Sequence, residues 1–248
     1  TTEVSGFLEG DDALATLAAF RAMGVEIDGP ENGEVTIHGV GMHGLKEPDH
    51  ELDMGNSGTS IRLLSGLLSG QNFNTTLAGD SSLSKRPMSR VIDPLAKMGA
   101  VIGSNEGKPP LHVQGDNQLY AISYELPIAS AQVKSCLLLA GMYAKGKTTI
   151  VEPATTRDHS ERMLKGMGYP VEVKGDTVCI EGGGRLTATT IDVPSDISSA
   201  TFFMVGAAIS EGSDITLKHV GINPTRIGVV NILRMMGANI SLSNETVT

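Results

Sequence analysis

The chain has 248 residues, of which 40% are hydrophobic and 19% charged, and its formal net charge is −9. This acidic balance argues against a nucleic-acid-binding protein, because phosphate backbones favour basic surfaces. No apolar run approaches the roughly 20 residues that a helix needs to cross a bilayer, so we expect no membrane association.

The first predicted elements are a strand in the opening TTEVSG and an amphipathic helix that ends at Met23. Apolar residues at Ala13, Leu17 and Phe20 keep helical spacing. The Met is followed by Gly24, a residue that tolerates the positive φ of a helix C-terminus, and then by the β-branched run VEI. A short helix closed by Met-Gly and followed by a strand is therefore predicted.

The same ending recurs along the chain. The four Met-Gly pairs begin at Met23, Met98, Met167 and Met236, which lie 75, 69 and 69 residues apart. Between them a strand leads through a small polar segment into an apolar helix of small residues and then into another strand. The helix segments read LDMGNSGTSIRLLSGLLSG, YELPIASAQVKSCLLLAG and IDVPSDISSATFFMVGAAISEG, and the strands that follow them read NTTLAG, KTTIVEP and SDITLKHVG.

The predicted repeating unit is strand, buried helix, strand, amphipathic helix and two strands. Such a period is typical of pseudo-symmetric units that share one core. Residues 53–121 and 122–191 make two complete units, whereas residues 1–52 lack the opening strand and buried helix, and residues 192–248 begin a fourth unit. We expect both ends of the chain to be truncations.

The segment Gly39–Gly44, GVGMHG, fits a dinucleotide-binding fingerprint. The residues after it read LKEPD, with no helix to receive a pyrophosphate, so we interpret it as a turn. The segment Gly55–Arg62, GNSGTSIR, places four small or polar residues where a helix begins. Capping explains one of them, whereas exposed N–H groups and the helix dipole suit an anion, and both interpretations stay open.

Basic residues gather in GDSSLSKRPMSR, where Lys85, Arg86 and Arg90 interrupt an acidic protein. Arginine suits bidentate contact with carboxylate or phosphate, although a solvated basic turn is the alternative.

The helix in ELPIASAQVKSCLLLAG is apolar in its body, yet it begins with Ser130, Gln132 and Lys134. Capping would explain Ser130 alone, and an anion-binding helix start would explain the set. Within its body lies Cys136, far from Cys179, and both lie in apolar runs. Free, buried thiols in a reducing, cytoplasmic compartment are predicted.

The segment TTRDHSERML places Arg157, Asp158 and His159 at a helix start. We expect Asp158 to cap the helix, and we assign no catalytic role to His159. The remaining histidines show no metal-ligand spacing, so we expect no metal site. Together, the helix starts and basic turns could converge on one anionic ligand, but the reaction does not follow from the residues alone.

Several long motifs resemble those of the EPSP synthase (3-phosphoshikimate 1-carboxyvinyltransferase) family. They read LDMGNSGTSIRLL, GDSSLSKRPMSRVIDPL, PIASAQVKSCLLLAG, EPATTRDHSERML and DVPSDISSATFF. The resemblance covers nearly the whole chain in the family's order, and SAQVKS and TRDH are similar to one bacterial group. It implies an α/β fold (α+β in some schemes), a pseudo-threefold inside-out α/β barrel of β-α-β-α-β-β repeats with helices inside and sheets outside. Residues 1–193 would form the N-terminal domain without its first strand and helix, and residues 194–248 the truncated beginning of the second.

The resemblance implies transfer of the enolpyruvyl group of phosphoenolpyruvate to the 5-hydroxyl of shikimate 3-phosphate, with release of phosphate and without metal or cofactor. The residues implied to hold shikimate 3-phosphate are Ser130, Ala131, Gln132 and Arg157. Those implied to hold phosphoenolpyruvate are Arg86, Gly58 and Gln132. The resemblance also places Asn56 and Asp12 near the reacting groups. For Lys134 it leaves open whether the amine reaches the phosphate or is solvated.

The family is the target of glyphosate, which competes for the phosphoenolpyruvate pocket. With glycine at position 58 the pocket keeps its room, so Gly58→Ala is expected to weaken glyphosate more than phosphoenolpyruvate. The intact enzyme is expected to be a monomer, whereas the chain alone can self-associate through its incomplete units.

Residues that the family uses at its start and in its second domain, including the proton-transfer groups, would lie before Thr1 and after Thr248. We therefore expect the chain alone to be inactive and to bind shikimate 3-phosphate weakly. The alternative enzyme is the UDP-N-acetylglucosamine enolpyruvyl transferase, whose loop before Arg-Pro usually carries a cysteine that SSLSK lacks. RNA 3′-phosphate cyclase shares related units, but the acidic balance argues against it. A non-catalytic fragment with half a site is the remaining alternative, and titration with shikimate 3-phosphate would distinguish it from an inert scaffold.

Overall fold

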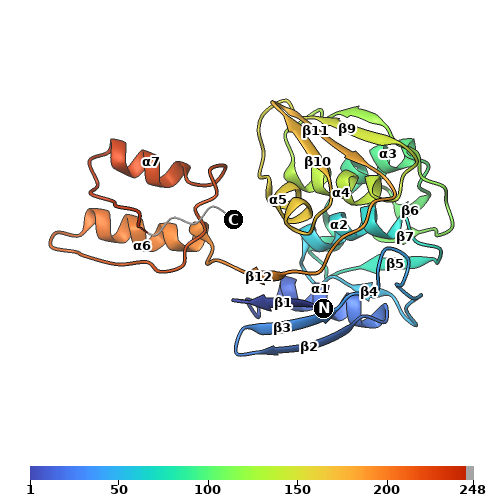
Figure 1. The fold of residues 1–248 in the computed structure, drawn as a ribbon, viewed down its shortest axis with the longest axis horizontal. Helices are drawn as coiled ribbons and strands as arrows, with labels where there is room; N and C mark the ends of the chain where they lie inside the picture. The colour runs from blue at the N-terminus through green and yellow to red at the C-terminus, as the bar shows by residue number, and fades with distance from the viewer. Residues whose placement is uncertain (244–248) are drawn as a thin grey trace. The chain divides into compact units, whose positions relative to one another are not determined.

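The computed structural model of the protein describes residues 1–243 (Figure 1). The chain divides into two compact units, Thr1–Ile191 and a second that begins at Asp192. Among the described residues, no helix is long and apolar enough to cross a membrane.

The first unit contains three sheets of four strands each. The first sheet consists of β1 (Thr2–Ser5), β2 (Glu26–Glu31), β3 (Glu34–His38) and β12 (Thr190–Asp192). The second consists of β4 (Leu52–Asp53), β5 (Thr75–Ala78), β6 (Ile102–Asn105) and β7 (Lys108–Val113). The third consists of β8 (Ser123–Glu125), β9 (Lys147–Val151), β10 (Val171–Lys174) and β11 (Thr177–Glu181).

The three sheets share one strand order. The second runs β4-β5-β7-β6 and the third runs β8-β9-β11-β10, and in both the first pair is parallel and the others are antiparallel. The first sheet runs β12-β1-β3-β2, so β12 takes the position that β4 and β8 hold in the other two. The sequence predicts a first unit without its opening strand, and the structure fills that position with residues from much later in the chain.

The four predicted Met-Gly endings are confirmed. The helices are α1 (Asp11–Ala22), α3 (Ser89–Lys97), α5 (His159–Gly166) and α7 (Gly228–Met235), and a methionine is the C-cap residue of each. The glycine after each methionine has a positive φ: 83° at Gly24, 100° at Gly99, 79° at Gly168 and 96° at Gly237. Glycine is needed at these positions because a side chain is disfavoured in the left-handed region.

The helices α2 (Gly58–Leu68) and α4 (Ala131–Gly141) lie inside the first unit, with the sheets around them (Figure 1). Their apolar residues, such as Ile61 and Leu137, are fully buried in the core. The two helices approach closely at Gly66, where an added Cβ would lie 2.1 Å from the carbonyl oxygen of Cys136. The unit is thus an α/β fold with its helices inside and its sheets outside.

The second unit differs from the prediction. Its helix α6 (Ile197–Ile209) was expected to be buried like α2 and α4, but only Ile197 and Ala200 are buried in it. Residues 213–221, expected as a strand, form only an isolated bridge between Ser195 and Val220. The physical reason is that no sheet covers α6 among the described residues from position 193 onward.

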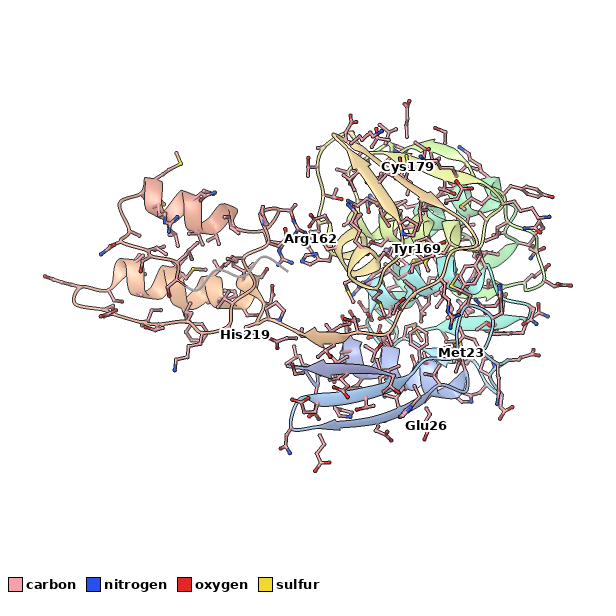
Figure 2. All side chains as sticks on the ribbon, in the orientation of Figure 1. Met23, Glu26, Arg162, Tyr169, Cys179 and His219 are labelled. Atoms are coloured by element: carbon pink, nitrogen blue, oxygen red, sulfur yellow. The ribbon has the colours of Figure 1, made fainter. Side chains whose placement is uncertain are left out.

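Two smaller expectations can be compared with the structure. The segment Gly39–Gly44 lies in the loop between β3 and β4, as its interpretation as a turn predicts. Both cysteines are free, but only Cys136 is buried, and burial raises the pKa of its thiol to about 12. The other, Cys179, is half-buried on the outer sheet strand β11, because alternate residues of a strand face opposite sides (Figure 2).

Candidate active site

The start of α2 is organised by serine hydroxyls. Ser57 is the N-cap residue, and its Oγ accepts a hydrogen bond from the backbone N–H of Ser60 at 3.2 Å. The Ser60 hydroxyl lies 2.6 Å from the Thr16 hydroxyl, which joins α2 to α1. Capping therefore accounts for the serines, and Asn56 and Gly58 stay available for other contacts.

The loop that carries Arg86 is held against the start of α2. A short 3₁₀ helix, η1 (Leu83–Lys85), precedes this arginine, and Asp80 Oδ1 accepts the backbone N–H of Leu83 at 2.7 Å. Asn56 bridges the two segments: its Nδ2 donates to Asp80 Oδ2 at 2.8 Å, and its Oδ1 accepts from Arg86 Nη2. The hydrogen bond from Asn56 is the largest of the causes that lower the pKa of Asp80. The structure thus brings together Asn56 and Arg86, two residues that the resemblance assigns to the site.

A second arginine, Arg62, lies in the same cluster, and sequence reasoning missed it. Its Nη1 donates to the Gly58 carbonyl and to Gln132 Oε1, both at 3.0 Å. Burial first, and then the neighbouring charges of Arg86 and Arg90, lower the pKa of the Arg62 guanidinium. The signal for it was visible in the sequence, because a single arginine in an apolar, buried helix is uncommon without a partner.

Gln132 connects α4 to this cluster. In addition to its bond with Arg62, its Nε2 donates to Thr59 Oγ1 at 2.8 Å. Gly58 lies between the arginines, because an added Cβ would stand 2.9 Å from Nη1 of both Arg62 and Arg86. The three residues assigned to phosphoenolpyruvate by resemblance, Arg86, Gly58 and Gln132, therefore lie together. We call Gly58, Arg62, Arg86 and Gln132 the arginine cluster.

The start of α4 carries the residues assigned to shikimate 3-phosphate. Ser130 is the N-cap residue and accepts from the Val133 N–H at 3.4 Å, a long bond that leaves its hydroxyl free to donate elsewhere. Ala131 and Gln132 are the first residues of the helix, where backbone N–H groups have no partner within the helix. All three are half-buried. This arrangement suits an anion that approaches the helix N-terminus.

The remaining assigned residues are exposed. Arg157 lies just before α5, in the loop that follows β9. Asp12 lies in the first turn of α1, and only its backbone carbonyl contacts the side chain of Thr16, at 2.9 Å. No hydrogen bond or ion pair of the described residues joins the Asp12 carboxylate to the arginine cluster.

The structure excludes one of the two alternatives left open for Lys134, and at α5 one prediction is wrong. Lys134 is not solvated: it is 1% exposed, and its Nζ lies 2.9 Å from Glu152 Oε2 and 2.7 Å from Glu161 Oε1. Asp158 occupies the N-cap position of α5 without a side-chain capping bond. Its carboxylate instead accepts from Arg162 Nε at 2.8 Å, four residues along the helix. In both places the side chain contacts an oppositely charged group, which binds it more strongly than water or a backbone N–H would.

The arginine cluster and the start of α4 can together hold an anion with two acidic groups. Arg62 is bonded to carbonyl and amide oxygens, so its charge is not neutralised by a carboxylate bond. Arg86 donates from Nη2 to Asn56, which in turn contacts Asp80, and no hydrogen bond among the described residues uses Arg86 Nη1 or Nε. The described residues hold no group of three or more His, Cys, Asp or Glu side chains placed to bind a metal ion.

Comparison with known proteins shows which family the chain matches. The sequence model of a family described as EPSP synthase (3-phosphoshikimate 1-carboxyvinyltransferase) matches residues 1–248. The chain is 69% identical over 245 residues to a 3-phosphoshikimate 1-carboxyvinyltransferase of Alkalilimnicola ehrlichii, covering 98% of this chain and 55% of the relative. It is 66% identical over 242 residues to that of Methylococcus capsulatus, covering 97% and 55%.

A solved structure of EPSP synthase from Acinetobacter baumannii superposes with a TM-score of 0.94 at 61% identity. The match covers 99% of this chain and 56% of that one. The chain therefore spans about half the length of the relatives it matches.

Proposed function

The chain belongs to the EPSP synthase family, and we propose that it supplies the part of the active site that holds both substrates. The proposed reaction joins the enolpyruvyl group of phosphoenolpyruvate to the 5-hydroxyl of shikimate 3-phosphate and releases phosphate. Residues 1–193 are the N-terminal domain in this proposal, and residues 194–248 begin a second domain. The observation that carries it is the convergence of Arg86, Gly58 and Gln132 from three separate segments.

Each substrate has a set of residues with suitable chemistry. Arg86 and Arg62 present planar guanidinium groups, which match the carboxylate and phosphate of phosphoenolpyruvate. Ser130, Ala131 and Arg157 present a hydroxyl, backbone N–H groups and a guanidinium to the phosphate of shikimate 3-phosphate. Gln132 stands between the two sets, because it starts α4 and contacts Arg62 on α2.

Asn56 and Asp12 complete the proposed site. Asn56 orients Arg86 through its carbonyl oxygen. The Asp12 carboxylate is exposed and is proposed to contact the reacting groups once substrates are bound. The reaction is proposed to need no metal and no cofactor, so turnover should survive a chelator. We also place the protein in the cytoplasm, a proposal supported by two free cysteines.

Titration of the 248-residue chain with shikimate 3-phosphate tests the binding half of the proposal. We expect saturable binding that is lost in Arg157→Ala, because that change removes a charged contact to the phosphate. UDP-N-acetylglucosamine serves as the competing ligand, and preference for it would favour the sister enolpyruvyl transferase. Absence of any binding would favour an inert scaffold.

A chimera tests the catalytic half. Residues 1–248 replace the matching segment of the Alkalilimnicola ehrlichii relative, which is 69% identical to them. We expect phosphate release that depends on both substrates and that falls by at least about a hundredfold in Arg86→Ala. The 248-residue chain alone is expected to release no phosphate. A chimera that folds and binds both substrates without turnover would contradict the proposal.

A further inference from the structure

Lys134 is buried between two carboxylates and belongs to no substrate contact described above. Its side chain is 1% exposed, and those of Glu152 and Glu161 are 5% and 4% exposed. The three residues come from different places in the chain: α4, the residue that follows β9 and the first turn of α5. We call Lys134, Glu152 and Glu161 the ion cluster.

Two further contacts connect the same elements. The hydroxyl of Ser135, next to Lys134 on α4, lies 2.6 Å from the hydroxyl of Ser160 on α5. The hydroxyl of Thr156 donates to Glu152 Oε1, the oxygen that Lys134 does not use. Thr156 immediately precedes Arg157. The loop that carries Arg157 is thereby connected through Glu152 to the start of α4.

Burying charges in this way is unfavourable unless the geometry is well satisfied. Taking an ammonium and two carboxylates out of water costs several kcal/mol for each ion, and apolar residues of similar size often stabilise a core better. Glu161 Oε2 is buried and has no hydrogen-bond partner among the described residues, so Lys134 is the ionic contact that holds this side chain. Core packing alone therefore does not explain a lysine at this position. Ionic contacts that fix the distances between α4, the residue that follows β9 and α5 do explain it.

We infer that Lys134 is a positioning residue, whose ion cluster sets Arg157 at the distance from Ser130 and Gln132 that a phosphorylated substrate requires. This inference rests on the proposed function, in which those residues share one ligand. Direct contact between Lys134 and substrate is ruled out by its burial. Its amine instead holds Glu152, whose other oxygen holds Thr156 in the loop that carries Arg157. The same amine holds Glu161 on α5.

The decisive test uses Thr156→Val in the 248-residue chain, because this change keeps the size and every charge of the region. Shikimate 3-phosphate is titrated at a temperature where far-ultraviolet circular dichroism shows the variant folded. We expect affinity to fall about five- to tenfold, less than the loss of a direct hydrogen bond to a charged group, because Thr156 acts on the ligand only through the Arg157 loop. Thr156→Ser keeps the hydroxyl and is expected to restore affinity. Thr155→Val, a matched change at the exposed neighbour, is expected to bind like the unaltered chain.

Hydrogen exchange of the backbone amides of residues 154–158 gives a readout that does not depend on substrate. We expect faster exchange in Thr156→Val and in Lys134→Met, and no change in Thr155→Val. If Lys134→Met does not fold, Thr156→Val alone decides. Equal affinity and equal exchange in Thr156→Val and the unaltered chain would overturn the positioning role and leave the proposed function standing. Failure of the unaltered chain to bind shikimate 3-phosphate would overturn the proposed function, and the positioning role with it.

Discussion

At the scale of single residues, Gly58 shows how a missing side chain can define a site. An added Cβ would stand 2.9 Å from both Arg62 Nη1 and Arg86 Nη1, closer than real Cβ contacts allow. These atoms are the far ends of flexible side chains, so they can move without unfolding the protein. The effect of a substitution should therefore appear in ligand binding rather than in stability.

We expect Gly58→Ala in the chimera to raise the inhibition constant of glyphosate at least about tenfold, or about 1.4 kcal/mol, with a smaller rise in KM for phosphoenolpyruvate. Glyphosate separates its two acidic groups by a longer chain than phosphoenolpyruvate does, so it needs more of the space that the methyl group would fill. Steady-state inhibition kinetics measure both constants. Equal rises in the inhibition constant of glyphosate and in KM for phosphoenolpyruvate would contradict this expectation.

Removing the Lys134 amine should strongly destabilise the first unit. Lys134→Met leaves Glu152 and Glu161 buried without their cation, which costs about 3–5 kcal/mol for a broken buried pair. Lys147→Met is the matched control, because Lys147 Nζ also lies 2.8 Å from a glutamate, Glu172, but on the exposed face of the outer sheet. Urea unfolding of both variants gives the comparison. Similar midpoints in the two variants would show that burial adds nothing to the Lys134 contacts.

The sequence predicted which residues lie close together best where a motif was long and worst where a residue had two plausible partners. Arg86, Gly58 and Gln132 came from separate motifs, and the structure brings them together. Lys134 could not be assigned from sequence, because its carboxylate partners lie 18 and 27 positions further along the chain and on other elements. Arg62 could not be assigned to the cluster from sequence, because its side-chain partner Gln132 lies 70 positions further along the chain on another helix.

At the scale of elements, the crossing of α2 and α4 depends on Gly66. We expect Gly66→Ala to destabilise the protein by about 1–3 kcal/mol, because the new methyl group would meet the backbone oxygen of Cys136 at 2.1 Å. Gly206→Ala on α6 is the control: a Cβ there meets nothing within 4 Å, and alanine favours a helix interior by about 1 kcal/mol. The midpoint temperature of thermal unfolding should therefore fall in Gly66→Ala and rise in Gly206→Ala. A shift in the same direction would mean that helix propensity outweighs the close approach.

Elements were predictable where the signal was local. A Met-Gly pair predicts both where a helix ends and that the glycine has a positive φ, and the structure has this feature at all four pairs. The burial of α6 and the strand expected at residues 213–221 depended instead on partners elsewhere in the chain. The apolar composition of a helix indicates that it packs against another element. It does not indicate whether that element lies within the described residues.

At the scale of the whole molecule, the two units differ in how well they cover their own apolar surface. In the second unit Phe202, Phe203 and Met235 are 80%, 65% and 87% exposed. Large apolar side chains exposed to this extent favour association when they lie together on a surface. The first unit, in contrast, has a core that runs through all its sheets.

We therefore expect residues 1–193 to fold alone, to be monomeric and to keep the shikimate 3-phosphate affinity of the 248-residue chain. The longer chain should self-associate through its second unit, with a sedimentation coefficient that rises with concentration. Phe202→Ser combined with Phe203→Ser in the longer chain is expected to reduce that rise. Concentration-dependent sedimentation of residues 1–193 would place the association surface in the first unit instead.

The position of β12 has a consequence for the order in which the protein is made. Strands β1, β2 and β3 end at His38, whereas the strand that completes their sheet is Thr190–Asp192. During synthesis the edge of β1 stays open until the ribosome has produced both of the intervening units. Among the three sheets of the first unit, the one whose strands come first in the chain is thus completed last, and a nascent chain halted before residue 190 lacks the strand that pairs with β1.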